Sequence, residues 1–192
     1  MQIMTEKEQE VIVDPEWENF FQERVRRRET LLHLLATIPV FSLLRAEELK
    51  KLSTIVHVRQ FKTGEMVIRR GVKLSGFYIV RQGSVNIVRD VDGEPQVLAT
   101  LRPPELIGEF ALLDDNPRST SIVAAESSEL IGFFKPDLMD IMVTNPGMGC
   151  AILLRLAEDM GETLKNDYRK LRELGYPFPE QLAEEKLDPT TS

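Results

Sequence analysis

The spacing of apolar residues predicts helices at both ends of the chain and short strands between them. From Pro15 to Pro39 apolar side chains recur every three or four residues, the period of a helix that buries one face. Asp14 and Pro15 are typical of a helix start, because aspartate caps free amides and proline fits the first turn. We therefore expect residues 1–37 to form an N-terminal helical extension, and a second short helix to begin at Ser42.

The central region, residues 38–135, alternates between apolar and polar positions and is punctuated by glycine. Its apolar-rich runs, such as residues 77–80 and 84–88, are short and recur at regular intervals. Asp92 and Gly93 between two such runs are a strong hairpin signal. Short, evenly spaced strands indicate an all-β barrel or sandwich, and no parallel βαβ alternation is present.

Helical spacing returns at residues 136–178. A short helix is expected to open at Pro136 and to stop near Asn145, and a long one to follow. The long helix should end at about Leu174, because Gly175 comes directly after it.

Composition and charge exclude several classes of protein. The chain has 192 residues, is 42% hydrophobic and carries a formal net charge of −7, which suits one domain with appended helices. The acidic balance argues against broad attraction to nucleic acid or anionic lipid. No apolar run approaches the roughly 20 residues of a membrane span, and the polar N-terminus does not resemble a signal peptide. With one cysteine and no intrachain disulfide, we expect a cytoplasmic protein whose acidic end, residues 179–192, is a flexible tail.

One segment interrupts the strand pattern. Residues 109–113 can form about one helical turn, and Gly108 before it lets a ligand approach the backbone closely. The amides of residues 109–111 would point at an anion, and Arg118 can bring a planar cation to the same anion. Glu109 can accept hydrogen bonds from a sugar hydroxyl. An anion beside a hydroxyl is what a ribose cyclic phosphate offers, although the same residues also suit a turn with a surface salt bridge.

The chain reads IGEFAL at residues 107–112 and PRSTS at residues 117–121. It also reads FKTGE at residues 61–65 and FYIVRQGSV at residues 77–85. In this order and spacing the four motifs closely resemble the cyclic-nucleotide-binding domain family, and the first two resemble its phosphate-binding cassette. The resemblance covers roughly residues 38–160.

The resemblance implies an eight-stranded β jelly roll with N-terminal helices and with C-terminal helices that move on ligand binding. It gives Glu109 the ribose 2′-hydroxyl and Arg118 the equatorial phosphate oxygen, with backbone amides completing the phosphate cradle. The ligand-binding residues that it implies are Gly108, Glu109, Phe110, Ala111, Arg118, Ser119 and Thr120.

Two features depart from the family pattern. Pro103-Pro104-Glu105 stands where the family usually carries Pro-Gly-Asp, and residues 71–76 lack the acidic residues common there. Neither departure changes Glu109 or Arg118, so we expect an altered loop geometry and a retained site.

The resemblance also bears on the choice of ligand. Relatives with alanine after the arginine tend to prefer cyclic AMP, and threonine there favours cyclic GMP in some members. Ser119 lies between these cases and favours cyclic AMP, with cyclic GMP as the alternative. A residue of the C-terminal helix normally covers the base, and the candidates by reach are Tyr168, Arg169 and Arg172.

The long helix carries apolar residues at close to heptad spacing, which suits either packing on its own barrel or a parallel homodimer. Only 18 residues follow Leu174, and they are acidic and proline-containing, so we expect no helix-turn-helix and no DNA binding. The expected function is that of a stand-alone regulatory sensor, without enzymatic activity, that signals to a separate protein effector.

Two alternatives remain open. A metal-dependent enzyme of the cupin type needs a cluster of histidine and carboxylate ligands, and His33 and His57 are not spaced as a metal pair. A structural protein-interaction domain with the same fold would bind no nucleotide, but degenerate members of the family normally lose the glutamate or the arginine. Glu109 and Arg118 are both present.

Overall fold

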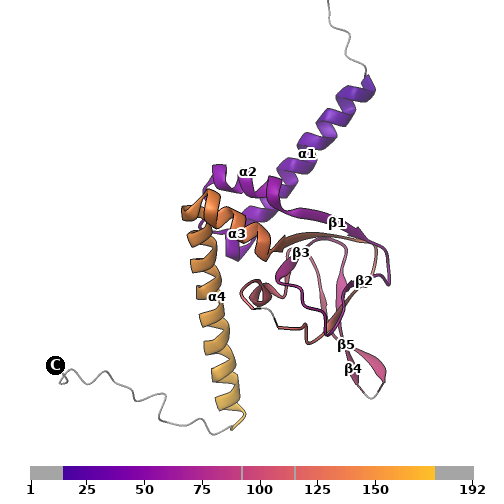
Figure 1. The fold of residues 1–192 in the computed structure, drawn as a ribbon. Coiled ribbons are helices and arrows are strands. Elements are labelled where there is room, and N and C mark those ends of the chain that lie inside the picture. The colour runs from indigo at the N-terminus through magenta and orange to yellow at the C-terminus, as the bar shows by residue number, and fades with distance from the viewer. Residues whose placement is uncertain (1–14, 92, 115, 176–192) are drawn as a thin grey trace, which may run out of the picture.

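Eight β-strands form two antiparallel sheets in the computed structural model, which describes residues 15–91, 93–114 and 116–175 (Figure 1). The strands are β1 (His57–Phe61), β2 (Met66–Ile68), β3 (Gly76–Gln82), β4 (Val85–Val91), β5 (Glu94–Leu101), β6 (Leu106–Ile107), β7 (Ser121–Ala124) and β8 (Ser128–Phe134). The first sheet has the order β1-β8-β3-β6 and the second β2-β7-β4-β5, so the chain passes repeatedly between the two sheets. The predicted fold class, a mainly β roll with flanking helices, is confirmed.

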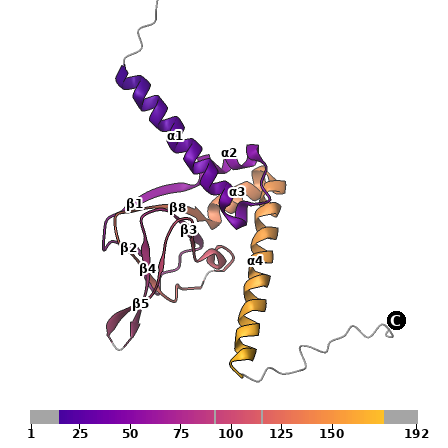
Figure 2. The same cartoon turned by 180° about the vertical axis from the view of Figure 1, so that it is seen from behind.

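Helices gather at one end and along one side of the roll. They are α1 (Pro15–Thr37), α2 (Ala46–Ile55), α3 (Lys135–Thr144) and α4 (Pro146–Glu173), with short 3-10 turns η1 (Pro39–Phe41) and η2 (Glu109–Leu112). In both views α1 points away from the roll, α2 and α3 lie at one end of it, and α4 runs down its side (Figures 1 and 2). Residues 1–14, Asp92 and the predicted tail lie outside the described residues.

The second helix begins at Ala46 rather than at Ser42, where the sequence pattern predicts it. The turn η1 occupies the chain just before it, and the Ser42 amide donates to the carbonyl of Pro39 at 3.0 Å. At the true start, the amide of Arg45 donates to the Glu48 carboxylate at 2.9 Å. The start of α2 is therefore indicated by Glu48, which caps it, and not by Ser42.

Strands β3 and β8 of the first sheet are buried on both faces, which makes this part of the sheet a middle layer between the helices and the second sheet. Along β3, Phe77 and Ile79 pack toward the helices, whereas Tyr78 and Val80 face the second sheet. Phe133 on β8 joins the helix side, with its ring 5.6 Å from that of Phe77. A strand buried on both faces needs a continuous apolar run, and β3 has one.

The start of α3 is fixed by two connections to the roll. The Asp137 carboxylate accepts the Phe134 amide at 2.8 Å and contacts His57 Nε2 at 3.0 Å, which joins the helix to β1. The amide of Lys135 donates to the carbonyl of Ser75 at 2.9 Å, which joins the helix to the loop before β3. Among the residues that the structure describes, no helix combines the length and apolar character needed to span a bilayer.

Candidate ligand-binding site

The peptide of Arg118 is bonded to the loop between β2 and β3. The Arg118 amide donates to the carbonyl of Val72 at 3.1 Å, and its carbonyl accepts the amide of Gly71 at 2.9 Å. Next to it, Lys73 and Pro117 form an isolated β-bridge. The segment between η2 and β7 thus lies against this loop as a short two-stranded piece, which directs the Arg118 side chain inward.

The Arg118 guanidinium has carbonyl oxygens as its partners. Its Nη1 donates to the carbonyl of Gly108 at 3.2 Å, and its Nη2 donates to the carbonyl of Gly76. Its Nε is buried and has no hydrogen-bond partner, and no carboxylate of the described residues forms an ion pair with it. Burial lowers the pKa of Arg118, while Asp114 and Glu109 oppose that shift from a distance. An arginine nevertheless keeps its proton, so a half-buried cation faces this part of the roll without a neutralising anion.

Gly108 permits a close approach to the backbone, and in this structure the Arg118 side chain makes it, whereas the approach of a ligand stays a prediction. Its φ is 74°, in the left-handed region, and a Cβ there would overlap with Nη1 of Arg118. Its carbonyl accepts two bonds, one from Arg118 and one from the amide of Ala111 at 3.2 Å. The second bond closes η2, so the Ala111 amide, which is predicted to contribute to a phosphate cradle, donates within the turn in this structure. The amides of Glu109 and Phe110 precede the first hydrogen bond of the turn, so the turn itself does not use them.

A cavity of about 250 Å³ lies beside Arg118, close to the lower limit of roughly 300 Å³ for small-molecule sites. Four predicted residues line it: Gly108, Arg118, Ser119 and Thr120. Its apolar wall consists of Ile68, Ile87, Leu106, Ile107 and Ile122. The sequence prediction missed this wall. The sequence signal for this wall is the alternation of apolar residues along β2, β4 and β7, which turns Ile68, Ile87 and Ile122 into the roll.

The remaining predicted residues do not line this cavity. Glu109, half-buried, lies on η2 next to Gly108, and Phe110 points to a second cavity of about 370 Å³ between η2 and α4. On the α4 side this second cavity is lined by Met160, Gly161, Thr163, Leu164 and Asp167.

The residues predicted as a base lid lie farther along α4 than the lining of the second cavity. Tyr168, Arg169 and Arg172 line neither of these two cavities, whereas the α4 residues that line the second lie between Met160 and Asp167. Tyr168 follows Gly161 by seven residues, which places the two on the same side of the helix about two turns apart. The lid assignment stays a prediction.

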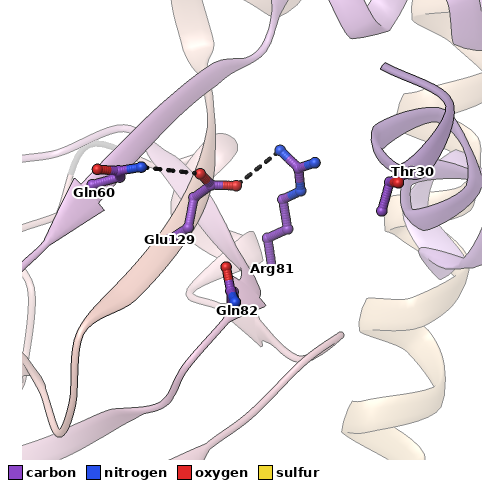
Figure 3. Close-up of a pocket in the computed structure, with 5 residues that line it drawn as sticks. All are labelled: Thr30, Gln60, Arg81, Gln82 and Glu129. Carbon is purple, nitrogen blue, oxygen red and sulfur yellow. Dashed lines mark hydrogen bonds and ion pairs between the residues drawn. The ribbon is translucent and has the colours of Figure 1, made fainter. Parts of the chain in front are cut away.

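A larger cavity, of about 480 Å³, lies between α1 and the first sheet (Figure 3). Arg81 and Glu129 form an ion pair of 2.8 Å within it, and Gln60 reaches the same carboxylate at 3.5 Å. Thr30 faces this group from α1. The cavity shares no lining residue with the cassette, and its arginine is already neutralised by Glu129, so it is a poorer anion site than Arg118.

No group of three or more histidine, cysteine, aspartate or glutamate side chains in the described ranges is arranged to hold a metal ion. His57 is instead engaged with Asp137.

Comparison with known proteins places this geometry in a family. Residues 58–145 match the family model of the cyclic nucleotide-binding domain. The cAMP-dependent protein kinase regulatory subunit of Mycosarcoma maydis is 32% identical over 104 residues, which is 54% of this chain and 20% of that protein. The cyclic AMP receptor protein of Thermus thermophilus is 31% identical over 125 residues, 65% of this chain and 58% of that protein. The human cGMP-dependent protein kinase 2 is 31% identical over 103 residues, 53% of this chain and 14% of that protein.

Among solved structures, the N-terminal domain of a transcriptional regulator from Streptomyces coelicolor A3(2) superposes with a TM-score of 0.64 at 27% identity. The match covers 69% of this chain and 94% of that one. The chain spans between 14% and 58% of the length of the three relatives above, so the shared part is the binding domain. The resemblance to the cyclic nucleotide-binding domain family that the sequence motifs predict is confirmed over residues 58–145.

Replacing Gly108 with alanine tests whether the turn is shaped by the guanidinium. A non-glycine residue in the left-handed region costs about 1–2 kcal/mol, and at this position the new Cβ also displaces Arg118. Gly64→Ala is the matched control, because Gly64 has a φ of 79° and a Cβ added there would have no atom within 4 Å. Urea unfolding should show a larger loss of stability for Gly108→Ala than for Gly64→Ala. Equal losses would mean that Arg118 does not lie against Gly108.

Proposed function

We propose that this chain binds a cyclic nucleotide in the cassette cavity, with cyclic AMP preferred over cyclic GMP. The bound state is passed to a separate protein effector through the flanking helices, and the chain catalyses no reaction itself. The observation that carries the proposal is the half-buried guanidinium of Arg118, which lines the cavity, has carbonyl partners and leaves a buried Nε unsatisfied.

A phosphate suits this guanidinium better than its present partners do. Bonds between a charged donor and a charged acceptor are roughly twice as strong as neutral ones, and a guanidinium can hold two phosphate oxygens at once. The same anion would also satisfy Nε and neutralise a cation whose burial is unfavourable. The family relatives named for cyclic nucleotides support this assignment.

The rest of the cavity suits a ribose. Ser119 and Thr120 offer hydroxyl groups beside Arg118, and the isoleucine wall offers an apolar surface to the sugar ring. Glu109 lies next to Gly108 with a carboxylate that can accept a ribose hydroxyl. Because the cavity is small, the base extends beyond it, toward the second cavity between η2 and α4.

Two observations bear on which base is preferred. Ser119 and the two relatives named for cyclic AMP support cyclic AMP. Asp167 favours cyclic GMP, because a carboxylate only accepts hydrogen bonds, and guanine presents two adjacent donors where adenine presents one donor beside an acceptor. Asp167 is exposed and lies 3.9 Å from Lys170, which weakens its contribution. We therefore keep cyclic AMP as the preferred ligand and treat Asp167 as a contrary influence.

The outer half of α4 is the surface that suits a protein partner. The first half of the helix buries Met148, Ile152 and Leu156 in the core, whereas Leu164 and Leu174 are 71% and 73% exposed. Packing on its own barrel therefore accounts for only part of the heptad-like pattern. A protein effector or a second copy of this chain would cover the remaining leucines. A structural domain that binds no nucleotide is the alternative function, and it shares this surface.

Arg118→Ala is expected to remove half or more of the stabilisation by cyclic AMP. Ligand at 100 times its dissociation constant stabilises the folded state by about 2.7 kcal/mol, which for a chain of this size raises Tm by roughly 5–10 °C. Losing charged hydrogen bonds of about 1.5–3 kcal/mol should weaken binding by roughly 10–150-fold. Differential scanning fluorimetry with cyclic AMP, cyclic GMP and non-cyclic AMP measures this.

Arg89→Ala, which removes an exposed arginine of β4, is the matched control and should respond as the parent protein does. No shift of the parent protein with either cyclic nucleotide at millimolar concentration would favour the structural-domain alternative. An equal shift in the Arg118→Ala variant would refute the assigned site.

Asp167→Asn is expected to raise the affinity for cyclic AMP relative to cyclic GMP by about fivefold, the effect of one exchanged hydrogen bond. The asparagine amide can both donate and accept, which matches the edge of adenine. Lys170→Ala is the control, since it removes the partner of Asp167 and leaves the carboxylate. Isothermal titration calorimetry gives both dissociation constants, and an unchanged ratio would mean that the base does not reach α4.

A further inference from the structure

The face of the first sheet that packs on the helices changes from apolar to polar toward one end. Along β8, Leu130 faces the second sheet and Ile131 faces the helices, so Glu129 faces the helices as well. Gln60 of β1 is paired with Glu129 in the ladder. Farther along β8, Phe133 packs into the helical core on the same side. Polar side chains therefore occupy a part of this face that lies under α1 (Figure 3).

Arg81 joins this polar group through a bulge in β3. Val80 pairs with Leu130 and Gln82 pairs with Glu129, so Arg81 is an extra residue between two regular pairs. A β-bulge re-aims a side chain, and bulges are frequent next to functional sites. Here Arg81 Nη1 lies 2.8 Å from the Glu129 carboxylate, and the two side chains are only 15% and 17% exposed. The bulge thus sets a largely buried ion pair on the helix-facing side of the sheet.

The ion pair borders a space that no side chain of the described residues fills. The cavity has a volume of about 480 Å³, which lies within the range of roughly 300–1,000 Å³ for small-molecule sites. Leu31 of α1 is buried in the helical core, whereas Thr30, one residue before it, faces the cavity. Besides the two charges, the lining that the structure describes is uncharged and polar, and consists of Thr30, Gln60 and Gln82. Amide and hydroxyl groups both donate and accept hydrogen bonds.

The paired charges determine which ligand the cavity suits. An anion beside Arg81 would be repelled by Glu129, and a cation beside Glu129 would be repelled by Arg81. A molecule with an ammonium and a carboxylate on neighbouring atoms avoids both penalties, because each of its charges can lie beside the opposite charge of the pair. A guanidinium has five donors and a carboxylate has two acceptor oxygens, so both can bind such a ligand while they stay paired. An apolar ligand would leave the polar lining without partners.

We propose that this cavity binds a free α-amino acid with an uncharged polar side chain. The ligand carboxylate accepts hydrogen bonds from Arg81, and the ligand ammonium donates to Glu129. Gln60, Gln82 and Thr30 bind its side chain. The cavity shares no lining residue with the cassette, so this proposal goes beyond the proposed function and does not depend on it.

Amide NMR spectra of the ¹⁵N-labelled full chain test the proposal by titration with L-glutamine, L-serine or L-threonine at millimolar concentration. At least one of them should move the resonances of the cavity residues in a saturable way, while those of Gly108 and Ser119 in the cassette stay in place. N-acetyl-L-glutamine lacks the ammonium, and 4-aminobutanamide lacks the carboxylate of glutamine. Each should bind about tenfold more weakly than glutamine or worse, because it loses hydrogen bonds between charged groups.

Arg81→Gln combined with Glu129→Gln removes both charges together and leaves no unpaired charge in the sheet. This double variant should bind the amino acid about tenfold more weakly or worse, and should respond to cyclic AMP as the parent protein does. Glu47→Gln combined with Lys50→Gln is the matched control, because it neutralises an exposed ion pair of 2.9 Å on α2. The control should titrate as the parent protein does.

Thr30→Val is a milder variant that removes one hydroxyl from an exposed position of α1. It should weaken binding by roughly two- to tenfold, the effect of one hydrogen bond, even if the double variant fails to fold. The proposal is overturned if none of the three amino acids gives a saturable response at the cavity, or if N-acetyl-L-glutamine binds as well as glutamine. An unchanged affinity in the folded double variant would overturn it too, and Arg81 and Glu129 would then be a structural ion pair.

Discussion

The guanidinium of Arg118 holds three separate segments of this molecule in place. Its bonds to the carbonyls of Gly108 and Gly76 join the turn η2 to the start of β3, and its own peptide is bonded to the loop before β3. A half-buried cation held by carbonyl dipoles is incompletely compensated, since its buried Nε has no partner. The same incompleteness supports the proposal that an anion binds here. Under that proposal one side chain serves both the fold and the binding of ligand, and a bound anion would alter the contacts that the side chain makes.

The middle position of the first sheet explains how such a local change can reach the helices. Strand β3 begins at Gly76, beside the arginine, and its side chains alternate between the roll and the helical core. Phe77 packs with Phe41 and Phe133 on the helix side, so the strand that borders the site also contacts the helical core. The helical core and the cassette therefore both adjoin β3.

The sequence was sufficient for the features that depend on local chemistry. Glycine turns and alternation predicted a roll of short strands. The two parts of the cassette were predicted to face one anion, and the structure does place Gly108 and Arg118 next to each other. The sequence was insufficient where tertiary packing decides. The motifs do not say which turns of α4 lie beside η2, and the structure places residues between Met160 and Asp167 there rather than Tyr168, Arg169 and Arg172. Nor do the motifs show that the Ala111 amide donates to Gly108 within the turn. The isoleucine wall could not be predicted from the motifs, because they do not say which strand residues face the cavity.

The central claim is that the Arg118 side chain binds the phosphate of a cyclic nucleotide, and arginine side-chain NMR tests it most directly. With ¹⁵N-labelled arginine, the Nε–H resonance of Arg118 can be assigned as the one lost in Arg118→Lys. The account predicts that cyclic AMP moves this resonance and slows its exchange with water, because Nε gains a phosphate partner, while the resonance of exposed Arg89 stays in place. Saturating cyclic AMP that leaves the Arg118 resonance unmoved would contradict the account.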